Sequence, residues 1–362
     1  MENNGKLILE NGSEYYGILF GSATQKVVEV VFNTSMVGYQ EIISDPSYTD
    51  QGVVMTYPLI GNYGMADDDY ETKEPSIGAL IVREYNDLPS NFRSRETLEE
   101  VMKKYDIAGI GNLDTRMLTR QIRSFGSMKG LICKADVGKE EGLKILNGAK
   151  LPNDAVSRVS TKEIIKSSIK EPKFKVVAID CGMKENIVRM LNHYGCDVIK
   201  VPYDTPYEKI TEFEPDGIFI SNGPGDPTDV SEVKDTVKKL IGKLPIFGIC
   251  LGHQILSLAY GAKTYKLKFG HRGGNHPVLN LKTGKIEITS QNHSYAVDKE
   301  SIEKTPLTIT HINSLDNTVE GVMCEKDKAF GVQYHPESAP GPEDSKYLFE
   351  VFMNFMEENR RA

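Results

Sequence analysis

The sequence contains no long apolar run, and none approaches the roughly 20 residues that a membrane-spanning helix requires. Its first 16 residues are charged and polar and lack the apolar core of a signal peptide. Blocks of Lys and Arg are also missing, and 43 basic against 51 acidic residues leave a net charge of −8. We therefore expect a protein that binds neither a membrane nor nucleic acid.

Cysteine is scarce and carries no pairing pattern. The five cysteines, at positions 133, 181, 196, 250 and 324, are an odd number, lie far apart and form no C-x-x-C pair. This spacing disfavours a disulfide framework or a thiolate zinc site and favours a reducing compartment, so we expect a cytoplasmic protein. The phosphate-binding motif G-x-x-x-x-G-K-[ST] is absent, and we therefore expect no nucleotide cofactor on this chain.

The 362 residues suffice for two or three domains, and 39% hydrophobic with 26% charged residues is typical of globular proteins. Residues 151–173 are polar, contain two prolines and have little apolar periodicity. We interpret them as a linker with at most one short helix. The predicted domains are therefore residues 1–150 and residues 174–362.

In the C-terminal domain, strand-like and helix-like runs alternate. The pattern predicts strands at 175–180, 197–201, 217–221 and 245–249, and helices at 184–194, 231–241 and 252–260. Such alternation implies right-handed crossovers and a parallel sheet covered by helices on both faces. Shorter β-like runs follow at 285–289, 307–312, 318–324 and 330–333, before a closing helix at about 345–359.

The N-terminal domain has a different pattern. It begins with short strands and turns, and helical segments follow near residues 98–105 and 115–125. We predict a smaller mixed α+β domain, whose topology does not follow from the pattern.

Cys250 lies where a predicted strand meets a predicted helix, between Gly248 and Gly252. The carboxyl edge of a parallel sheet is where such folds keep their sites, and flanking glycines permit a sharp, strained turn. The N-terminus of the following helix favours the reactive thiolate, and the amide of Leu251 can stabilise an oxyanion. A buried packing thiol is the alternative for any single cysteine, but the glycines and the strand–helix frame favour a nucleophile.

A cysteine nucleophile needs a base and a group that orients the base. In FGVQYHPES, a predicted strand ends just before His335, and Glu337 follows two residues later. We predict that His335 takes the thiol proton and that Glu337 holds its imidazole in one tautomer. The other histidines are weaker candidates: we expect His253, on the first turn of the helix after Cys250, to pack or to form a hydrogen bond.

Two further segments are rich in glycine. His271 and His276 flank the first, but no third ligand lies at helix or hairpin spacing, so we predict no metal site. The second, SNGPGDP at 221–227, follows a predicted strand, and Gly223 and Gly225 allow a ligand to approach the backbone closely. We expect it to supply a second oxyanion donor or to hold an amide substrate.

Three separated motifs together resemble the class I, triad-type glutamine amidotransferases: GICLGHQ around Cys250, NGPGDP at 222–227 and HPE at 335–337. Other stretches closely resemble the small, glutamine-hydrolysing chains of carbamoyl-phosphate synthetases, namely FNTSMVGYQEIISDPSY (32–48), DTRMLTRQIR (114–123) and KFGHRGGNHPV (268–278). This resemblance runs nearly end to end. It implies an α/β fold, with a parallel-sheet amidotransferase domain and flanking helices after the mixed α+β domain.

The resemblance also implies roles for single residues. Cys250 attacks the side-chain amide of glutamine, His335 moves the protons and Glu337 orients His335. The amides of Leu251 and Gly223 form the oxyanion hole. Ser47 comes from the N-terminal domain, so part of the substrate pocket is expected at the domain junction. The glutamine-binding residues carried over are Ser47, Gly223, Gly225, Leu251, Gln254, Asn292, Ser294 and Tyr295.

One position departs from the family. Some members carry Gly-Phe where this chain has Ser294-Tyr295. If only backbone groups act there, serine is harmless, whereas a positive φ at that position would disfavour it.

The resemblance further implies a partner. In this family the ammonia travels through a tunnel to a large chain, which uses bicarbonate and two ATP to make carbamoyl phosphate for arginine or pyrimidine biosynthesis. ATP and a divalent cation are therefore expected on the large chain and no metal or cofactor on this one. Two alternatives stay open: the glutaminase subunit of another synthase, for anthranilate or GMP, and a non-catalytic binding subunit with the same fold.

Overall fold

The computed structural model describes residues 3–22 and 25–361. The chain divides into two compact units, Met1–Pro152 and Asn153–Ala362. No helix in the described part of the chain combines the length and the apolar character needed to cross a bilayer.

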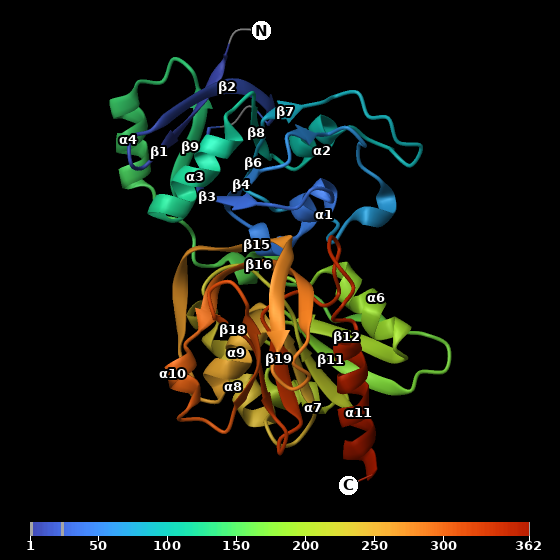
Figure 1. Cartoon of the computed structure of the whole chain (residues 1–362). Helices are drawn as coiled ribbons and strands as arrows, with labels where there is room; N and C mark the ends of the chain where they lie inside the picture. The colour runs from blue at the N-terminus through green and yellow to red at the C-terminus, as the bar shows by residue number, and fades with distance from the viewer. Residues whose placement is uncertain (1–2, 23–24, 362) are drawn as a thin grey trace. The chain divides into compact units, whose positions relative to one another are not determined.

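The N-terminal unit is built on a closed barrel with the strand order β1-β2-β8-β6-β4-β3-β9 (Figure 1). Its central strands β3, β4, β6 and β8 pair in parallel, and the remaining pairs are antiparallel. The bounds are β1 Gly5–Leu9, β2 Glu14–Gly21, β3 Lys26–Asn33, β4 Gln51–Met55, β6 Ala79–Ile81, β8 Ala108–Gly111 and β9 Met128–Lys134, with a separate parallel pair β5 Leu59–Ile60 and β7 Glu84–Tyr85.

Helices surround this barrel (Figure 1). The two predicted helices are confirmed as α2 (Leu98–Lys104) and α3 (Thr115–Phe125). Local chemistry explains where they begin: Thr97 and Glu100 form a reciprocal capping box, and the Asp114 carboxylate accepts the N–H of Met117. The other helical segments are α1 Tyr39–Ser44, α4 Lys139–Gly148, and the 3₁₀ turns η1 Pro46–Tyr48 and η2 Asp67–Asp69.

The C-terminal unit contains one large sheet in the order β10-β12-β11-β13-β14-β19-β18-β16-β15-β17. Strands β12, β11, β13, β14 and β19 pair in parallel and form its centre, which confirms the predicted α/β class. The bounds are β10 Ile165–Ser167, β11 Phe174–Asp180, β12 Cys196–Pro202, β13 Gly217–Ile220, β14 Ile246–Ile249, β15 Thr264–Asn280, β16 Ile286–Val297, β17 Thr308–Asn313, β18 Val319–Cys324 and β19 Ala329–Val332.

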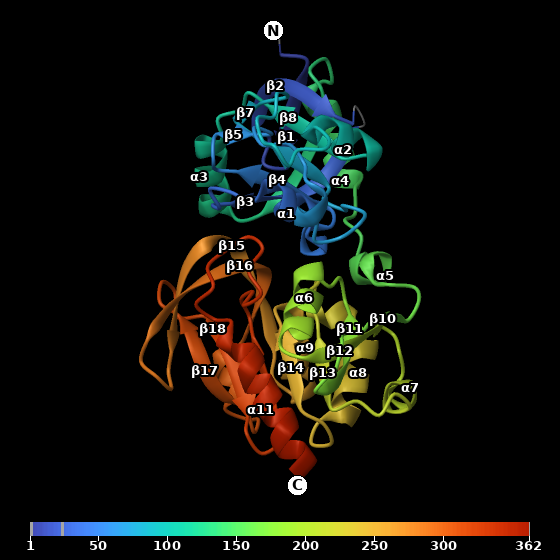
Figure 2. The same cartoon turned by 90° about the vertical axis from the view of Figure 1, so that its right-hand side faces the viewer.

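Helices cover both faces of the parallel strands, because alternate residues of each strand point to opposite sides. On β14, Phe247 packs into a core with α6 and α11, whereas Ile246 packs into a second core with α8 and α9. Figure 2 shows α11 running along its side of the sheet. The helix bounds are α5 Ala155–Val159, α6 Glu185–His193, α7 Tyr207–Thr211, α8 Ser231–Leu240, α9 Leu251–Ala259, α10 Lys299–Ile302 and α11 Tyr347–Arg361, with the 3₁₀ turn η3 Pro227–Asp229.

Two parts of the C-terminal unit differ from the sequence prediction. The stretch predicted as a linker contains the short helix α5, but also β10, which pairs antiparallel with β12 at the edge of the large sheet. The run predicted at 285–289 is only part of β16, and β15 was not predicted; these two strands form an extended antiparallel hairpin with register shifts (Figure 1). Bulges interrupt the alternation from which strands are recognised in a sequence.

Candidate active site

Cys250 lies at a strained turn between β14 and α9. It is the N-cap residue of α9, with φ 54° and ψ −105°, a conformation that a side chain rarely adopts. A Cβ on Gly248 would lie 2.6 Å from the backbone of Gly252, and one on Gly252 would lie 2.1 Å from the carbonyl oxygen of Ile220. Both glycines are therefore required by the close approach of the backbone, as the sequence predicted from their spacing.

His335 and Glu337 follow strand β19, the neighbour of β14. The parallel register pairs Ile249 with Val332, and the N–H of Cys250 donates to the Val332 carbonyl at 2.8 Å. The two chain segments therefore leave the same edge of the sheet side by side. His335 Nδ1 lies 2.7 Å from Glu337 Oε1, and all three side chains are buried. The structure thus brings together Cys250, His335 and Glu337.

The electrostatics of this trio favour an ion pair. Burial alone would lower the pKa of His335, but the Glu337 carboxylate and the adjacent Cys250 sulfur outweigh it and raise the pKa to about 10. Burial would raise the pKa of Glu337, but Lys184 and His335 lower it to about 2. Near neutral pH, His335 is therefore a cation held between the carboxylate and the sulfur, ready to donate a proton.

Lys184 is a site residue that the sequence reasoning missed. Its side chain is 3% exposed, and its ammonium lies 3.1 Å from Glu337 Oε1 and donates to the Ser338 carbonyl. Lys184 follows β11 at the same carboxyl edge that holds Cys250. Functional residues of parallel sheets gather at the carboxyl ends of the strands. This rule, which pointed to Cys250, could therefore have pointed to Lys184 as well.

Two neighbours contact the sulfur of Cys250. Its Sγ lies 3.5 Å from the Asn292 carbonyl oxygen, and Gln333 Nε2 lies 3.6 Å from it. The sequence reasoning missed Gln333. Gln333 lies two residues before His335. Because side chains of an extended segment alternate between two faces, this spacing could have placed Gln333 on the same side as His335.

The predicted glutamine-binding residues Gln254, Asn292 and Tyr295 lie on α9 and β16, and the Asn292 carbonyl contacts the sulfur. Gln254 Nε2 donates to the Tyr295 carbonyl at 2.8 Å and to Gln333 Oε1 at 2.9 Å, so its side chain has a defined orientation. Ser294 lies within β16, is not among the residues with positive φ, and accepts a hydrogen bond from Arg272. A serine is therefore compatible with this backbone.

The glycines of the SNGPGDP segment serve different purposes. A Cβ on Gly223 would lie 2.1 Å from the Cys181 carbonyl oxygen, whereas Gly225 is open but has φ +90°. Gly223 follows β13 and Leu251 is the first residue of α9, so the Leu251 N–H has no partner within its helix. The role of the Gly223 and Leu251 amides in an oxyanion hole stays a prediction.

Ser47 belongs to the N-terminal unit. It is buried in the 3₁₀ turn η1, where its N–H donates to Asp45 Oδ1 at 2.9 Å. Its role in binding glutamine stays a prediction.

The other four thiols and His253 are buried. Burial lowers the pKa of His253 to about 3, so it is a neutral packing residue, in line with the expectation from sequence. All five cysteines are free and buried. Burial raises the pKa of Cys133 to about 11 and that of Cys196 to about 12, and it also raises the pKa of Cys181 and Cys324. These four thiols are poor nucleophiles at neutral pH.

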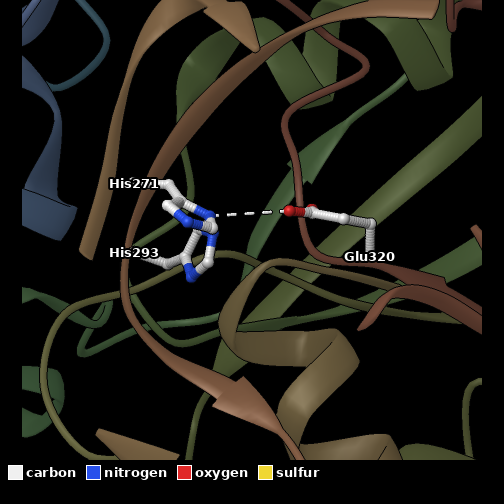
Figure 3. A group of neighbouring side chains, drawn as sticks. All are labelled: His271, His293 and Glu320. Atoms are coloured by element: carbon white, nitrogen blue, oxygen red, sulfur yellow. Dashed lines mark ion pairs between the residues drawn. The ribbon is translucent and has the colours of Figure 1, made fainter. Parts of the chain in front are cut away.

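One cluster bears on the prediction of no metal site, which stays untested. Figure 3 shows His271, His293 and Glu320 pointing toward one another, and one potential ligand atom of each lies within 4.8 Å of the other two. The sequence analysis considered His271 with His276, whereas the neighbours of His271 in this cluster come from β16 and β18. His276 is not in this group, and burial lowers its pKa to about 4.

Two families match the chain. Residues 177–355 match the family Glutamine amidotransferase class-I. Residues 7–132 match the family Carbamoyl-phosphate synthase small chain, CPSase domain.

Similar curated proteins extend over nearly the full chain. A carbamoyl phosphate synthase small chain from Fusobacterium nucleatum is 51% identical over 99% of this chain and 99% of its own. One from Bacillus cereus is 53% identical over 97% of this chain and 96% of its own. A carbamoyl phosphate synthase pyrimidine-specific small chain from Bacillus subtilis is 51% identical, with the same coverage of 97% and 96%.

Proposed function

This chain belongs to the family of carbamoyl phosphate synthase small chains, the glutamine-hydrolysing subunits of that enzyme, and we propose that Cys250, His335 and Glu337 perform its hydrolysis. The observation that carries this proposal is the trio's geometry. A cysteine on a strained strand–helix turn lies beside an imidazole that a buried carboxylate orients at 2.7 Å.

The proposed reaction has two steps. The Cys250 thiolate attacks the amide carbon of the glutamine side chain, while the N–H groups of Leu251 and Gly223 stabilise the oxyanion. The C–N bond breaks as His335 gives its proton to the leaving ammonia, and a γ-glutamyl thioester forms. His335, now neutral, takes a proton from water, which attacks the thioester. Glutamate leaves, and the thiolate is restored.

Lys184 and Glu337 support these proton transfers. The buried Lys184 ammonium keeps Glu337 ionised, and the ionised Glu337 keeps His335 in the tautomer that presents Nε2 to the reacting groups. We assign Lys184 a positioning role, because it acts through Glu337. Gln254, Asn292, Ser294 and Tyr295, together with Gly225 and Ser47, are the proposed glutamine-binding residues.

The partner is also part of the proposal. The small chains of this enzyme work with a large subunit, and we infer that this chain delivers ammonia to such a subunit. ATP and a divalent cation are then bound by the large subunit. Cytoplasmic location is consistent with five reduced cysteines.

A substitution tests the proposal in the reconstituted complex. Cys250→Ser replaces the nucleophile by a far weaker one, so we expect loss of glutamine-dependent carbamoyl phosphate synthesis and retention of ammonia-dependent synthesis. Cys324→Ser is the matched control, because that thiol is also buried but pairs with Ala329, at the opposite end of β19 from His335; both activities should remain. Loss of both activities in Cys250→Ser would assign Cys250 a structural role and contradict the proposal.

Two alternative functions follow from the sequence: a glutaminase subunit of another synthase and a non-catalytic binding subunit. Relatives of the same name along the full chain disfavour a glutaminase subunit for anthranilate or GMP synthesis. A non-catalytic subunit is tested by a glutamine analogue that alkylates thiols. Labelling of Cys250 alone supports catalysis, and an unlabelled chain supports the binding subunit.

A further inference from the structure

We propose that His271, His293 and Glu320 form a binding site for one divalent transition-metal ion, with Zn²⁺ as the best match. The three side chains come from three strands of the C-terminal unit, β15, β16 and β18 (Figure 3). The site uses none of the residues assigned to glutamine hydrolysis.

The potential ligand atoms are buried and poorly satisfied. His271 Nδ1 and His293 Nε2 have no hydrogen-bond partner among the described residues. His271 Nδ1 lies 3.6 Å from Glu320 Oε1, and one ligand atom of each residue lies within 4.8 Å of the others. In a tetrahedral zinc site with bonds of about 2 Å, ligand atoms are separated by about 3.3 Å. A small inward shift of these side chains would therefore complete the coordination.

The opposite nitrogen of each imidazole is already held. His293 Nδ1 donates to the Tyr295 carbonyl at 2.7 Å, which leaves the lone pair on Nε2. His271 Nε2 donates to Asp316 Oδ2 at 2.9 Å, so in the neutral imidazole, the form that a metal ion binds, the lone pair lies on Nδ1. Carbonyl and carboxylate partners of this kind orient metal-ligating histidines and raise their basicity.

The carboxylate is oriented in the same way. Glu320 is fully buried, its Oε1 accepts from Asn313 Nδ2 and its Oε2 accepts from Gln291 Nε2, both at 2.9 Å. Each of the three ligands thus has a hydrogen-bonding support that sets its direction, which is the arrangement expected around a metal.

A proton is the competing occupant. A protonated His271 between Asp316 and Glu320 would satisfy two members of the cluster, but it leaves the His293 Nε2 lone pair without a donor among the described residues. A metal ion accepts all three lone pairs at once. Two imidazoles and one carboxylate suit Zn²⁺, whereas Mg²⁺ and Ca²⁺ prefer oxygen ligands only. The fourth position would hold water.

Such an ion would tie together three strands next to the glutamine-binding segment. His293 directly follows Asn292, whose carbonyl contacts the Cys250 sulfur, and its Nδ1 shares the Tyr295 carbonyl with Gln254. We therefore assign the metal a structural role that holds β16 in place.

The test uses metal binding itself as the readout. The full chain carrying Cys250→Ser, which removes the nearby thiol, is stripped with a chelator and titrated with Co²⁺. We expect visible d–d absorption of a four- or five-coordinate ion at one equivalent, abolished by one equivalent of Zn²⁺ and unaffected by Mg²⁺.

Substitutions locate the site. Glu320→Gln and His271→Asn should each weaken Co²⁺ binding at least about 10-fold, and Asp316→Asn should weaken it by a comparable factor through His271. His193→Asn, which removes an exposed histidine elsewhere on the unit, should leave binding unchanged. Circular dichroism checks that each variant is folded.

Two results would overturn the proposal. One is the absence of stoichiometric Co²⁺ or Zn²⁺ binding by the parent chain, which needs no variant to interpret. The other is binding of equal strength by the parent, Glu320→Gln and His271→Asn. Neither result bears on glutamine hydrolysis, which the Cys250 experiment in the complex tests separately.

Discussion

At the scale of single residues, the buried charges around His335 decide the chemistry of the site. Lys184, Glu337 and His335 form a chain of alternating charge with almost no exposure to solvent. Desolvation disfavours each charge in isolation, so the three are stable only together. This arrangement presents a protonated imidazole to the sulfur at neutral pH.

Removing the Glu337 charge should break the electrostatic link between Lys184 and His335. In Glu337→Gln, we expect glutaminase kcat to fall by about 10²- to 10⁴-fold, because His335 loses its orienting partner. The alkaline limb of the kcat/KM profile should move to lower pH, because the carboxylate that raises the His335 pKa is gone. The buried Lys184 ammonium loses its carboxylate partner, which should cost about 3–5 kcal/mol of stability.

Steady-state kinetics as a function of pH and denaturant unfolding measure these effects. Glu343→Gln is the control, because Glu343 is exposed and pairs with Lys346 in the same segment. A Glu337→Gln chain that is less stable but keeps the parent pH profile would contradict the orienting role.

At the scale of elements, the turn from β14 into α9 limits what the site can tolerate. Gly248 and Gly252 cannot be replaced by a larger residue without strain, because backbone atoms occupy the space of a Cβ. Backbone atoms cannot rotate away as a side chain can. The parallel pairing of β14 with β19 then fixes where the histidine segment leaves the sheet.

Gly248→Ala should therefore damage both stability and activity. Its Cβ would lie 2.6 Å from the Gly252 backbone and 2.9 Å from the His253 N atom, so the turn must open. We expect a loss of about 1–3 kcal/mol in unfolding free energy, and about 10²-fold in glutaminase kcat, because the sulfur shifts relative to His335.

Gly148→Ala is the matched control for this substitution. Gly148 lies in α4 with an ordinary negative φ, and a Cβ added there would meet no atom of the described residues within 4 Å. Alanine should be neutral or stabilising there, by at most about 1 kcal/mol. Denaturant unfolding and glutaminase assays compare the pair, and equal behaviour would mean that the turn is not under strain.

At the scale of the whole molecule, buried ionisable groups give the C-terminal unit a stability optimum in pH. The His335 pKa is raised to about 10, so its contribution is complete below pH 6.5 and is lost as the pH rises toward 10. His253 and His311 have pKa values lowered to about 3 and 4, so their contribution is complete above pH 6.5 and is lost on acidification. Glu337 adds a loss below pH 4.5, toward its pKa of about 2.

We therefore expect maximum stability near pH 6.5, measured as the urea midpoint between pH 4 and 10. His335→Asn should remove part of the decline between pH 6.5 and 9.5, because the variant has no imidazolium to lose at this position. His193→Asn, at an exposed site, should keep the parent slope. An identical alkaline decline in His335→Asn would show that His335 is not charged in the folded state.

Local patterns in the sequence determined the regular part of this protein. Strand–helix alternation from residue 175 onward, the glycines around Cys250 and the short spacing of His335 and Glu337 are signals read within a few residues. Backbone sterics and side-chain period produce them directly. Helices α2 and α3 could also be predicted, because helix caps and apolar spacing are local features of the sequence.

Tertiary structure alone decided the rest, because its contacts join residues far apart in the chain. The N-terminal barrel pairs strands separated by long loops, β10 gains its partner only within the folded sheet, and bulges hide the length of β15 and β16. Lys184 meets Glu337, and His271 meets His293 and Glu320, across strands whose order no local pattern contains. Sequence determined which side chains could react, and the sheet order decided which of them meet.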